Sequence, residues 1–288
     1  MSDILIAPLP SLLVEQAVET ALAEDFGRAG DITSQLVVPE TAQAKGVIAA
    51  RQDGVLAGLG LAMQAFQKCD PLIELKAVKQ DGQKLTAGDA VLEIQGNGRA
   101  VLAAERVALN YLGHLSGIAS LTHAYVAAIK GTQARITCTR KTTPNLRALE
   151  KYAVRCGGGV NHRFGLDDGV LIKDNHIAVA GGVTAAVQAA LAGAGHMIRV
   201  EIEVDTLAQL DEALAAGAQA VLLDNMPPET LREAIAMING RAVAEASGNV
   251  SLDTVKEIAE TGVDYISVGR LTHSAPCLDL GLDFEISL

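Results

Sequence analysis

The hydrophobic pattern of the N-terminal half predicts an antiparallel sheet with a few helices. Residues 11–24 carry apolar side chains at helical spacing, with Ser11 placed to cap the helix. From about residue 45 to 105, short β-like runs are separated by glycines. Hairpin turns are expected at 53–54, 81–82 and 88–89, where Asp and Gly are adjacent.

A long apolar run at 101–130 then predicts a helix that is broken around Gly113 to Gly117. After residue 135 the pattern changes to short apolar strands that alternate with amphipathic helices. The expected helices span 206–218, 228–240 and 251–262, with Pro227, Pro228 and Ser251 as start signals for the last two. The expected strands span 134–139, 169–172, 198–204, 220–223, 241–246 and 265–269.

Acidic residues recur at a fixed interval in this second half. Glu203, Asp224 and Glu245 lie 21 residues apart, each at the expected end of a strand, and one further step reaches Ile266. Regular βα units of that length predict a parallel barrel. Because the chemistry of such barrels lies at the C-terminal ends of the strands, these positions are candidate site residues.

Composition and charge narrow the class of function. The 288-residue chain is 49% hydrophobic but only 3% aromatic, has no Trp and carries a formal net charge of -11. Such a chain lacks the rings of a base-stacking platform and the basic surface that binds polyanions. Its four cysteines show no C-x-x-C pair, and its N-terminus resembles no signal peptide, so we expect a cytoplasmic protein without membrane spans.

A basic segment interrupts this acidic chain. Residues 135–173 contain eight Lys or Arg against three Asp or Glu, whereas from residue 174 onward five basic residues face seventeen acidic ones. Several arginines around one cavity indicate a ligand with more than one carboxylate or phosphate, since guanidinium groups bind such anions bidentately. The candidates that strand ends bring together are Arg140, Lys141, His162, Arg163 and Lys173.

Acidic and glycine-containing strand ends complete the expected site. Glu203 and Asp224 could bind ribose hydroxyls, hold Mg²⁺ between substrate phosphates or stabilise a developing cation. Glu201 has the same strand parity as Glu203, so alternation leaves the choice between them open. The loops after the last two strands are suited to a phosphate through backbone N–H groups, and they contain Ser247, Gly248, Asn249 and Gly269.

The chain resembles the quinolinate phosphoribosyltransferase family over essentially its whole length. The resemblance rests on the runs at 24–34, 105–120, 139–177, 200–214, 221–225, 245–251 and 260–274, of which TRKTTPNLRALEKYAVRCGGGVNHRFGLDDGVLIKDNHI is the longest. It implies an N-terminal α/β sandwich domain (1–115, with the tail 276–288 packed on it) and an open, TIM-like α/β barrel of about six strands (116–275). It also implies transfer of phosphoribosyl from phosphoribosyl pyrophosphate to quinolinate with decarboxylation, a step of NAD biosynthesis.

The resemblance further assigns roles to residues. It implies that Arg140, His162, Arg163 and Lys173 hold the carboxylates of quinolinate and that Lys141 lies near the reacting centre. Glu203 and Asp224 would engage the ribose and Mg²⁺, directly or indirectly. Ser247, Gly248, Asn249 and Gly269 would take the 5′-phosphate. A homodimer is implied in which Arg106 reaches the partner subunit's site, with a hexamer left open.

Two positions depart from this pattern or carry no role in it. Arg270 stands where the family usually has a small residue, so it adds either a phosphate contact or a surface charge. Cys156 lies beside a glycine run and is read as a packed thiol. The alternatives are a nicotinate phosphoribosyltransferase, a Schiff-base enzyme that uses Lys173, and a non-catalytic binding relative of the same fold.

Overall fold

The computed structural model describes residues 6–287, which form two compact units. Unit 1 contains residues 6–123, 149–158 and 274–287, and unit 2 contains residues 124–148 and 159–273. Segment 149–158 packs with unit 1, whereas the boundary drawn after residue 115 from the sequence assigns it to the barrel.

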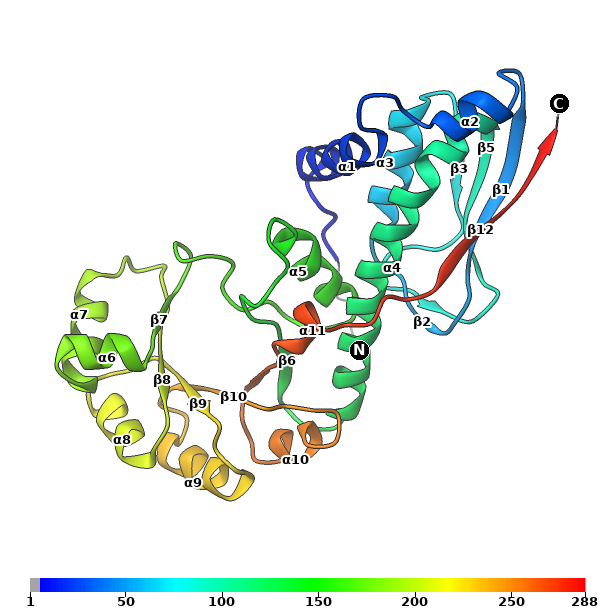
Figure 1. Cartoon of the computed structure of the whole chain (residues 1–288). Helices are drawn as coiled ribbons and strands as arrows, with labels where there is room; N and C mark the ends of the chain where they lie inside the picture. The colour runs from blue at the N-terminus through cyan, green and yellow to red at the C-terminus, as the bar shows by residue number, and fades with distance from the viewer. Residues whose placement is uncertain (1–5, 288) are drawn as a thin grey trace. The chain divides into compact units, whose positions relative to one another are not determined.

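Unit 1 is built on a four-stranded sheet of order β12-β1-β5-β3, with a separate β2-β4 pair. Every pairing is antiparallel, which confirms the antiparallel sheet predicted for this half. The hairpins expected at 53–54, 81–82 and 88–89 are wrong, because strands that follow one another from β1 to β5 do not pair with each other. The last strand, β12, runs beside β1 and forms one edge of the sheet (Figure 1). The elements are α1 (Ser11–Phe26), α2 (Ile32–Val37), β1 (Gln43–Ala50), β2 (Gly54–Val55), α3 (Leu59–Cys69), β3 (Glu74–Ala77), β4 (Lys84–Leu85), β5 (Ala90–Asn97) and β12 (Leu280–Ser287).

The long helix α4 (Gly98–Ala128) is continuous, so the predicted break at Gly113 to Gly117 is wrong. These glycines do not end the helix; they let the backbone of residues 276–278 approach it closely. A Cβ at Gly117 would lie 2.0 Å from the Pro276 carbonyl oxygen, and one at Gly113 would lie 3.1 Å from that of Leu278. The helix therefore accepts their helix-propensity cost of about 1 kcal/mol each in exchange for close backbone packing.

Two expected helix starts are also wrong. Ser11 is the first residue inside α1, which begins after Pro10 without a side-chain cap. Helix α10 begins at Val255, with Thr254 at the N-cap. Ser251 lies in the preceding turn, and its carbonyl accepts from the backbone N–H groups of Thr254 and Val255. Both positions show that a hydroxyl residue near a periodic run marks a helix start only to within a few residues.

Unit 2 is an open barrel, as the resemblance implies. Its six strands are parallel and ordered β6-β11-β10-β9-β8-β7, so β6 and β7 are the two edges. Helices α6 to α9 lie outside strands β7 to β10 (Figure 1). The strands are β6 (Arg135–Thr137), β7 (Val170–Ile172), β8 (Val200–Val204), β9 (Ala220–Asp224), β10 (Val243–Ser247) and β11 (Tyr265–Ser267), and all six were predicted.

Helices α5, α6 and α7 were not predicted individually. Helix α5 lies inside the basic segment 135–173, and α6 and α7 follow β7, the second strand of unit 2, where polar side chains and glycines obscure the helical period. The helices that follow β6 in the chain are α5 (Arg147–Cys156), most of which packs with unit 1, and α6 (Asp174–Ala180), α7 (Val183–Gly193), α8 (Leu207–Ala215), α9 (Pro228–Ile238), α10 (Val255–Ala259) and α11 (Arg270–His273). Within residues 6–287 no single helix is long and apolar enough to cross a membrane, and only the bent pair α6 and α7 passes that test jointly, by length and composition.

Candidate active site

A cavity of about 380 Å³ opens at the C-terminal ends of the unit 2 strands. This end of a parallel barrel is where catalytic groups gather. The cavity brings together most of the residues that were singled out from the sequence. Its lining is Thr139, Arg140, Lys141, His162, Arg163, Leu171, Lys173, Glu203, Leu222, Asp224, Glu245, Ser247 and Ser267.

Two of the arginines that line this cavity each have one unmet hydrogen-bond donor. The Nε atoms of Arg140 and Arg163 are buried and have no acceptor among the described residues. Arg163 is held in place by a 2.8 Å bond from Nη1 to the Gly169 carbonyl. Burial, and next the charge of Arg140, lower the pKa of Arg163, yet a guanidinium remains protonated in proteins. Buried, unmet cationic donors indicate that an anion completes the site.

Lys173 and Glu203 pair across adjacent strands. Lys173 is the N-cap of α6, where its backbone N–H donates to His176 Nδ1 at 2.9 Å, and its Nζ lies 2.5 Å from Glu203 Oε2. Asp224 ends the next strand, β9, and also lines the cavity. The cavity therefore holds cations and carboxylates side by side, as a ligand with both a polyanionic and a sugar part requires.

Lys141 is positioned by its own backbone. Its N–H donates to Thr139 Oγ1 at 3.0 Å, and its carbonyl accepts from Thr272 Oγ1 at 2.7 Å. A Cβ at Gly269 would lie 3.2 Å from the Lys141 side chain, so a small residue there leaves room for the lysine.

His162 is held inside the barrel by two glutamates. Its Nε2 lies 3.1 Å from Glu201 Oε2 and 3.7 Å from Glu245 Oε1, while its Nδ1 accepts from the Arg163 backbone N–H at 2.7 Å. A ring whose Nδ1 accepts must carry its proton on Nε2, which then donates to Glu201. The three side chains have metal-ligand spacing, but this tautomer leaves no lone pair on Nε2 for an ion. The trio is therefore a polar cluster at the cavity wall, in which His162 is hydrogen-bonded to Glu201.

Glu245 sits deeper than the sequence indicated. It is the third residue of β10 and pairs in register with Leu222, one layer below Ser247, so its expected position at the strand end is wrong. Only 5% of it is exposed, and its Oε1 has no hydrogen-bond partner among the described residues. Burial, and next the Glu201 charge, raise the pKa of Glu245 to about 7. Sequence alternation alone marked Glu245 as inward but not its depth.

The remaining expected residues lie near the cavity or elsewhere. Gly248 and Asn249 follow β10 in a tight turn, with φ of 94° and 50°. Arg270 begins α11 and is exposed. Arg106 belongs to unit 1, where it lies on α4 with 65% of its side chain exposed. The structure does not place these last two side chains in the cavity lining.

Cys156 also lies in unit 1, in a buried position at the end of α5. Burial, and next the Asp81 charge, raise the pKa of its thiol to about 12. It fits the expectation of a packed thiol, and none of the four cysteines, all within residues 6–287, forms a disulfide.

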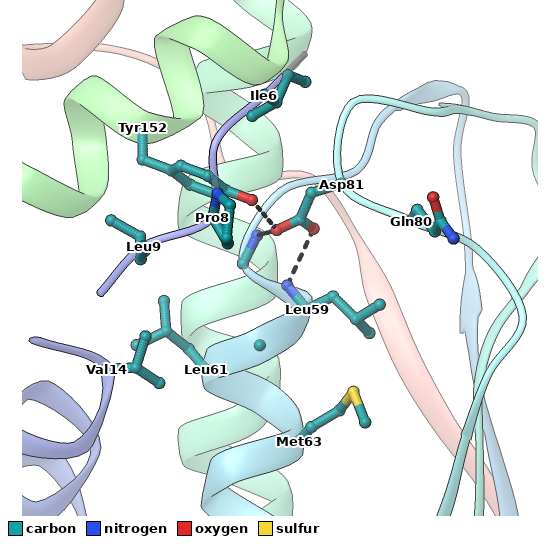
Figure 2. Close-up of a pocket in the computed structure, with 12 residues that line it drawn as sticks. Ile6, Pro8, Leu9, Val14, Leu59, Leu61, Met63, Gln80, Asp81 and Tyr152 are labelled. Atoms are coloured by element: carbon teal, nitrogen blue, oxygen red, sulfur yellow. Dashed lines mark hydrogen bonds between the residues drawn. The ribbon is translucent and has the colours of Figure 1, made fainter. Parts of the chain in front are cut away.

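A second cavity, in unit 1, differs in chemistry. It measures about 370 Å³ and is lined mainly by apolar side chains from the N-terminal segment and α3 (Figure 2). Its carboxylate, Asp81, accepts from the backbone N–H groups of Gly58 and Leu59 and from the Tyr152 hydroxyl. A satisfied carboxylate among apolar groups does not attract an anion, so the cationic cavity of unit 2 is the candidate active site.

Comparison with known proteins agrees with this geometry. Residues 31–116 match the model of the quinolinate phosphoribosyl transferase N-terminal domain, and residues 118–283 match that of its C-terminal domain. The chain belongs to the quinolinate phosphoribosyltransferase family. The expected family and fold are thereby confirmed.

Members of the quinolinate phosphoribosyltransferase family match at high identity over nearly the full chain. The probable nicotinate-nucleotide pyrophosphorylase [carboxylating] of Bacillus subtilis is 44% identical, covering 92% of this chain and 91% of its own. That of Mycobacterium leprae is 44% identical, covering 92% and 95%. The crystal structure of NadC from Streptococcus pyogenes superposes with a TM-score of 0.93 at 43% identity, covering 98% and 99%.

Proposed function

We propose that the chain transfers the phosphoribosyl group of phosphoribosyl pyrophosphate to quinolinate, with loss of one carboxylate as carbon dioxide. The products are nicotinate mononucleotide and pyrophosphate, the last belonging to the leaving group. Family membership supports the reaction class. The observation that carries the assignment of the site is the pair of buried, unmet Nε donors on Arg140 and Arg163. A planar dicarboxylate supplies an acceptor for each of them.

The cationic residues bind and orient the aromatic substrate in this proposal. Arg140 and Arg163 take its two carboxylates, and Lys173 adds a third cation at the rim of the same cavity. His162 lines the same cavity and supports this arrangement, because both of its ring nitrogens are engaged, by Glu201 and by the Arg163 backbone. The ring nitrogen of quinolinate is thereby fixed toward the sugar. Holding two reactants in this way removes much of the entropy cost of their encounter.

The acids act on the sugar. As pyrophosphate departs from the anomeric carbon, positive charge develops on the ribose, and Glu203 and Asp224 stabilise it. Lys141 faces the departing anion. The pyridine nitrogen forms the new bond to carbon and becomes cationic. The bond to the adjacent carboxylate then breaks, its electron pair remains on the ring carbon beside the cationic nitrogen, and a proton replaces carbon dioxide.

The donor set also suits Mg²⁺. Carboxylate oxygens at Glu203 and Asp224 are its preferred ligand type, and Mg²⁺ is commonly held by one or two carboxylates together with substrate phosphates. When bound, Mg²⁺ neutralises charge on the leaving pyrophosphate. The loop Ser247–Asn249 and Gly269 are proposed to take the 5′-phosphate through backbone N–H groups, as strand-end loops of barrels do.

We further propose a cytoplasmic homodimer in which Arg106 completes the partner subunit's site. Four cysteines that form no disulfide suit a reducing compartment. The exposed Arg106 has room to reach a second molecule, since 65% of its side chain is exposed and the Glu105 carboxylate beside it is 4.0 Å away.

The test is an assay of the purified chain with quinolinate, phosphoribosyl pyrophosphate and Mg²⁺. We expect nicotinate mononucleotide by chromatography, with carbon dioxide released in equal amount. Product from nicotinate and none from quinolinate would overturn the choice of substrate. Binding of quinolinate without any turnover would instead identify a non-catalytic relative of the family.

A further inference from the structure

Asn225 joins the end of β9 to the loop that follows β10. Its Nδ2 donates to Asp224 Oδ2 at 2.6 Å, and its Oδ1 accepts from Asn249 Nδ2 at 3.2 Å. Its backbone N–H donates to the Ser247 carbonyl at 2.9 Å. One residue therefore contacts both the acid proposed to engage the ribose and the loop proposed to take the 5′-phosphate.

The orientation of the Asn225 amide is fixed by its partners. A carboxylate only accepts, so the group that faces Asp224 must be the NH₂. The oxygen then points to the Asn249 amide, which donates to it. The pattern leaves a single assignment for the two amide ends, which a crystallographic map alone rarely distinguishes.

The backbone at this position is also specialised. Asn225 has a φ of 53°, in the left-handed region that asparagine tolerates better than most residues. Asn249 has a φ of 50° and Gly248 a φ of 94°, so three residues at two neighbouring strand ends adopt positive φ. Local strain of this kind is maintained only where surrounding contacts fix it.

Asn225 also explains why residue 248 must be glycine. A Cβ at Gly248 would lie 2.1 Å from Asn225 Oδ1, 2.5 Å from its Cγ and 2.9 Å from its backbone nitrogen. The side chain of Asn225 therefore packs directly against the Gly248 backbone. This close packing fixes the shape of the loop.

We infer that Asn225 is a positioning residue that sets the Asp224 carboxylate and the Ser247–Asn249 loop in register, so that ribose and 5′-phosphate are bound as one unit. The inference rests on the proposed function of this site. Asn225 itself need not touch either substrate. Removing it should weaken binding of the sugar phosphate and leave binding of quinolinate unaffected. The residues proposed to bind quinolinate follow other strands.

The main variants are Asn225→Gly, which keeps the positive φ but removes both amide contacts, and Asn225→Asp, which replaces the donor facing Asp224 by a second carboxylate. Asn239 supplies the matched control, since it is exposed, ends α9 and has a φ of 43°. Asn239→Gly and Asn239→Asp therefore repeat the same backbone and charge changes away from the site. Melting temperature of all four variants reports any general destabilisation.

Two measurements are made on each variant, steady-state kinetics and calorimetric binding of ribose 5-phosphate and of quinolinate. For Asn225→Gly we expect kcat/KM for phosphoribosyl pyrophosphate and affinity for ribose 5-phosphate to fall about 10- to 100-fold, the usual effect of losing a hydrogen bond to a charged group. Quinolinate affinity should stay within about twofold of that of the parent chain. Asn225→Asp should lose more, because like charges then adjoin at 224 and 225.

Coupling between the two amides supplies an independent readout. Asn249→Gly alone should weaken binding of ribose 5-phosphate. The double variant with Asn225→Gly should bind ribose 5-phosphate only slightly more weakly than Asn225→Gly by itself. Equal losses for quinolinate and ribose 5-phosphate, or unchanged ribose 5-phosphate binding in Asn225→Gly, would overturn the inference. An inactive parent chain that still binds ribose 5-phosphate would overturn the proposed reaction alone, and the binding data would then decide the role of Asn225.

Discussion

Lys173 Nζ lies 2.5 Å from Glu203 Oε2, and this ion pair joins the ends of the adjacent strands β7 and β8 at the cavity rim. The lysine is 46% exposed and the glutamate 16% exposed. The lysine end of the pair is therefore more exposed to solvent than the glutamate end. An amine that forms a Schiff base needs an apolar or cationic setting, whereas Lys173 faces a carboxylate. The geometry favours a role in binding anions, and borohydride with carbonyl substrates should trap no adduct at Lys173.

Glu203→Gln tests the acid of this pair. The change keeps the shape of the side chain and removes its charge, so the positive sugar loses a stabilising group. We expect kcat to fall by about 100- to 1,000-fold, the range found when one preorganised electrostatic group is removed. Steady-state kinetics measure it, and Glu257→Gln, an exposed change on α10, is the control. An unchanged kcat would transfer the role to another carboxylate, with Glu201 first in line.

Arg140→Ala tests whether Arg140 binds a carboxylate of quinolinate. Because the buried Arg140 Nε has no acceptor among the described residues, we expect the guanidinium to bind substrate. Its loss should weaken quinolinate by about 10- to 100-fold, as charge-assisted hydrogen bonds contribute about 1.5–3 kcal/mol. Calorimetry with quinolinate measures this directly. Arg232→Ala, an exposed change on α9, should leave the affinity unaltered. If Arg140 did not bind the substrate, Arg140→Ala and Arg232→Ala would show the same affinity for quinolinate.

Much of the barrel could be predicted because its signals are local and regular. Apolar runs of strand length, spaced by amphipathic helices, identified all six strands of unit 2. The helix break at Gly113 to Gly117 failed for the opposite reason. Those glycines pack against the backbone of Pro276 and Leu278, more than 150 residues away in sequence, and no local sequence pattern predicts such a contact.

The candidate site was predictable as a set of strand-end residues but not as a network. Its charged members stand out in an acidic chain, and seven of them line one cavity. The depth of Glu245 and the tautomer of His162 depend on register and on hydrogen-bond partners, which sequence spacing does not contain. Asn225 was missed because an asparagine after an acid resembles an ordinary turn. Only its positive φ and its bonds to Asp224 and Asn249 distinguish it.

Glu245→Gln tests the buried carboxyl through the pH dependence of stability. The folded pKa of about 7 lies above the ordinary value of 4.5, so between these values the folded chain holds a proton that the unfolded chain has released. Stability should therefore fall as pH rises through this window and level off above it. The lost stability is on the order of 3 kcal/mol.

The measurement compares melting temperatures of the parent chain and Glu245→Gln at pH 5 and pH 8. The variant cannot ionise, so its advantage over the parent chain should grow toward pH 8. Glu257→Gln should show no such trend, because that carboxylate is exposed. A parallel pH response of Glu245→Gln and the parent chain would mean that Glu245 is already ionised at pH 5 in the folded state.

The proposed exchange of Arg106 between subunits can be tested by mixing two inactive variants. Arg106→Ala lacks the residue offered to the partner, and Lys141→Ala lacks one in its own cavity. In a hybrid dimer, the subunit with intact Lys141 receives an intact Arg106 from its partner, while the other site has both defects. Random association should restore about a quarter of the parent activity, since half of the dimers are hybrid and each has one intact site.

Co-expression with two different affinity tags, followed by an assay of the doubly purified hybrid, gives the cleaner version of this test. The purified hybrid should then have about half of the parent activity per dimer. If each site were complete within one subunit, every site in the hybrid would carry a defect, and its activity would stay at the mean of the two inactive parents. Arg270→Ala in place of Arg106→Ala is the control, since this exposed arginine belongs to unit 2 of the same chain. With Lys141→Ala as its partner it should give no gain beyond its own dilution.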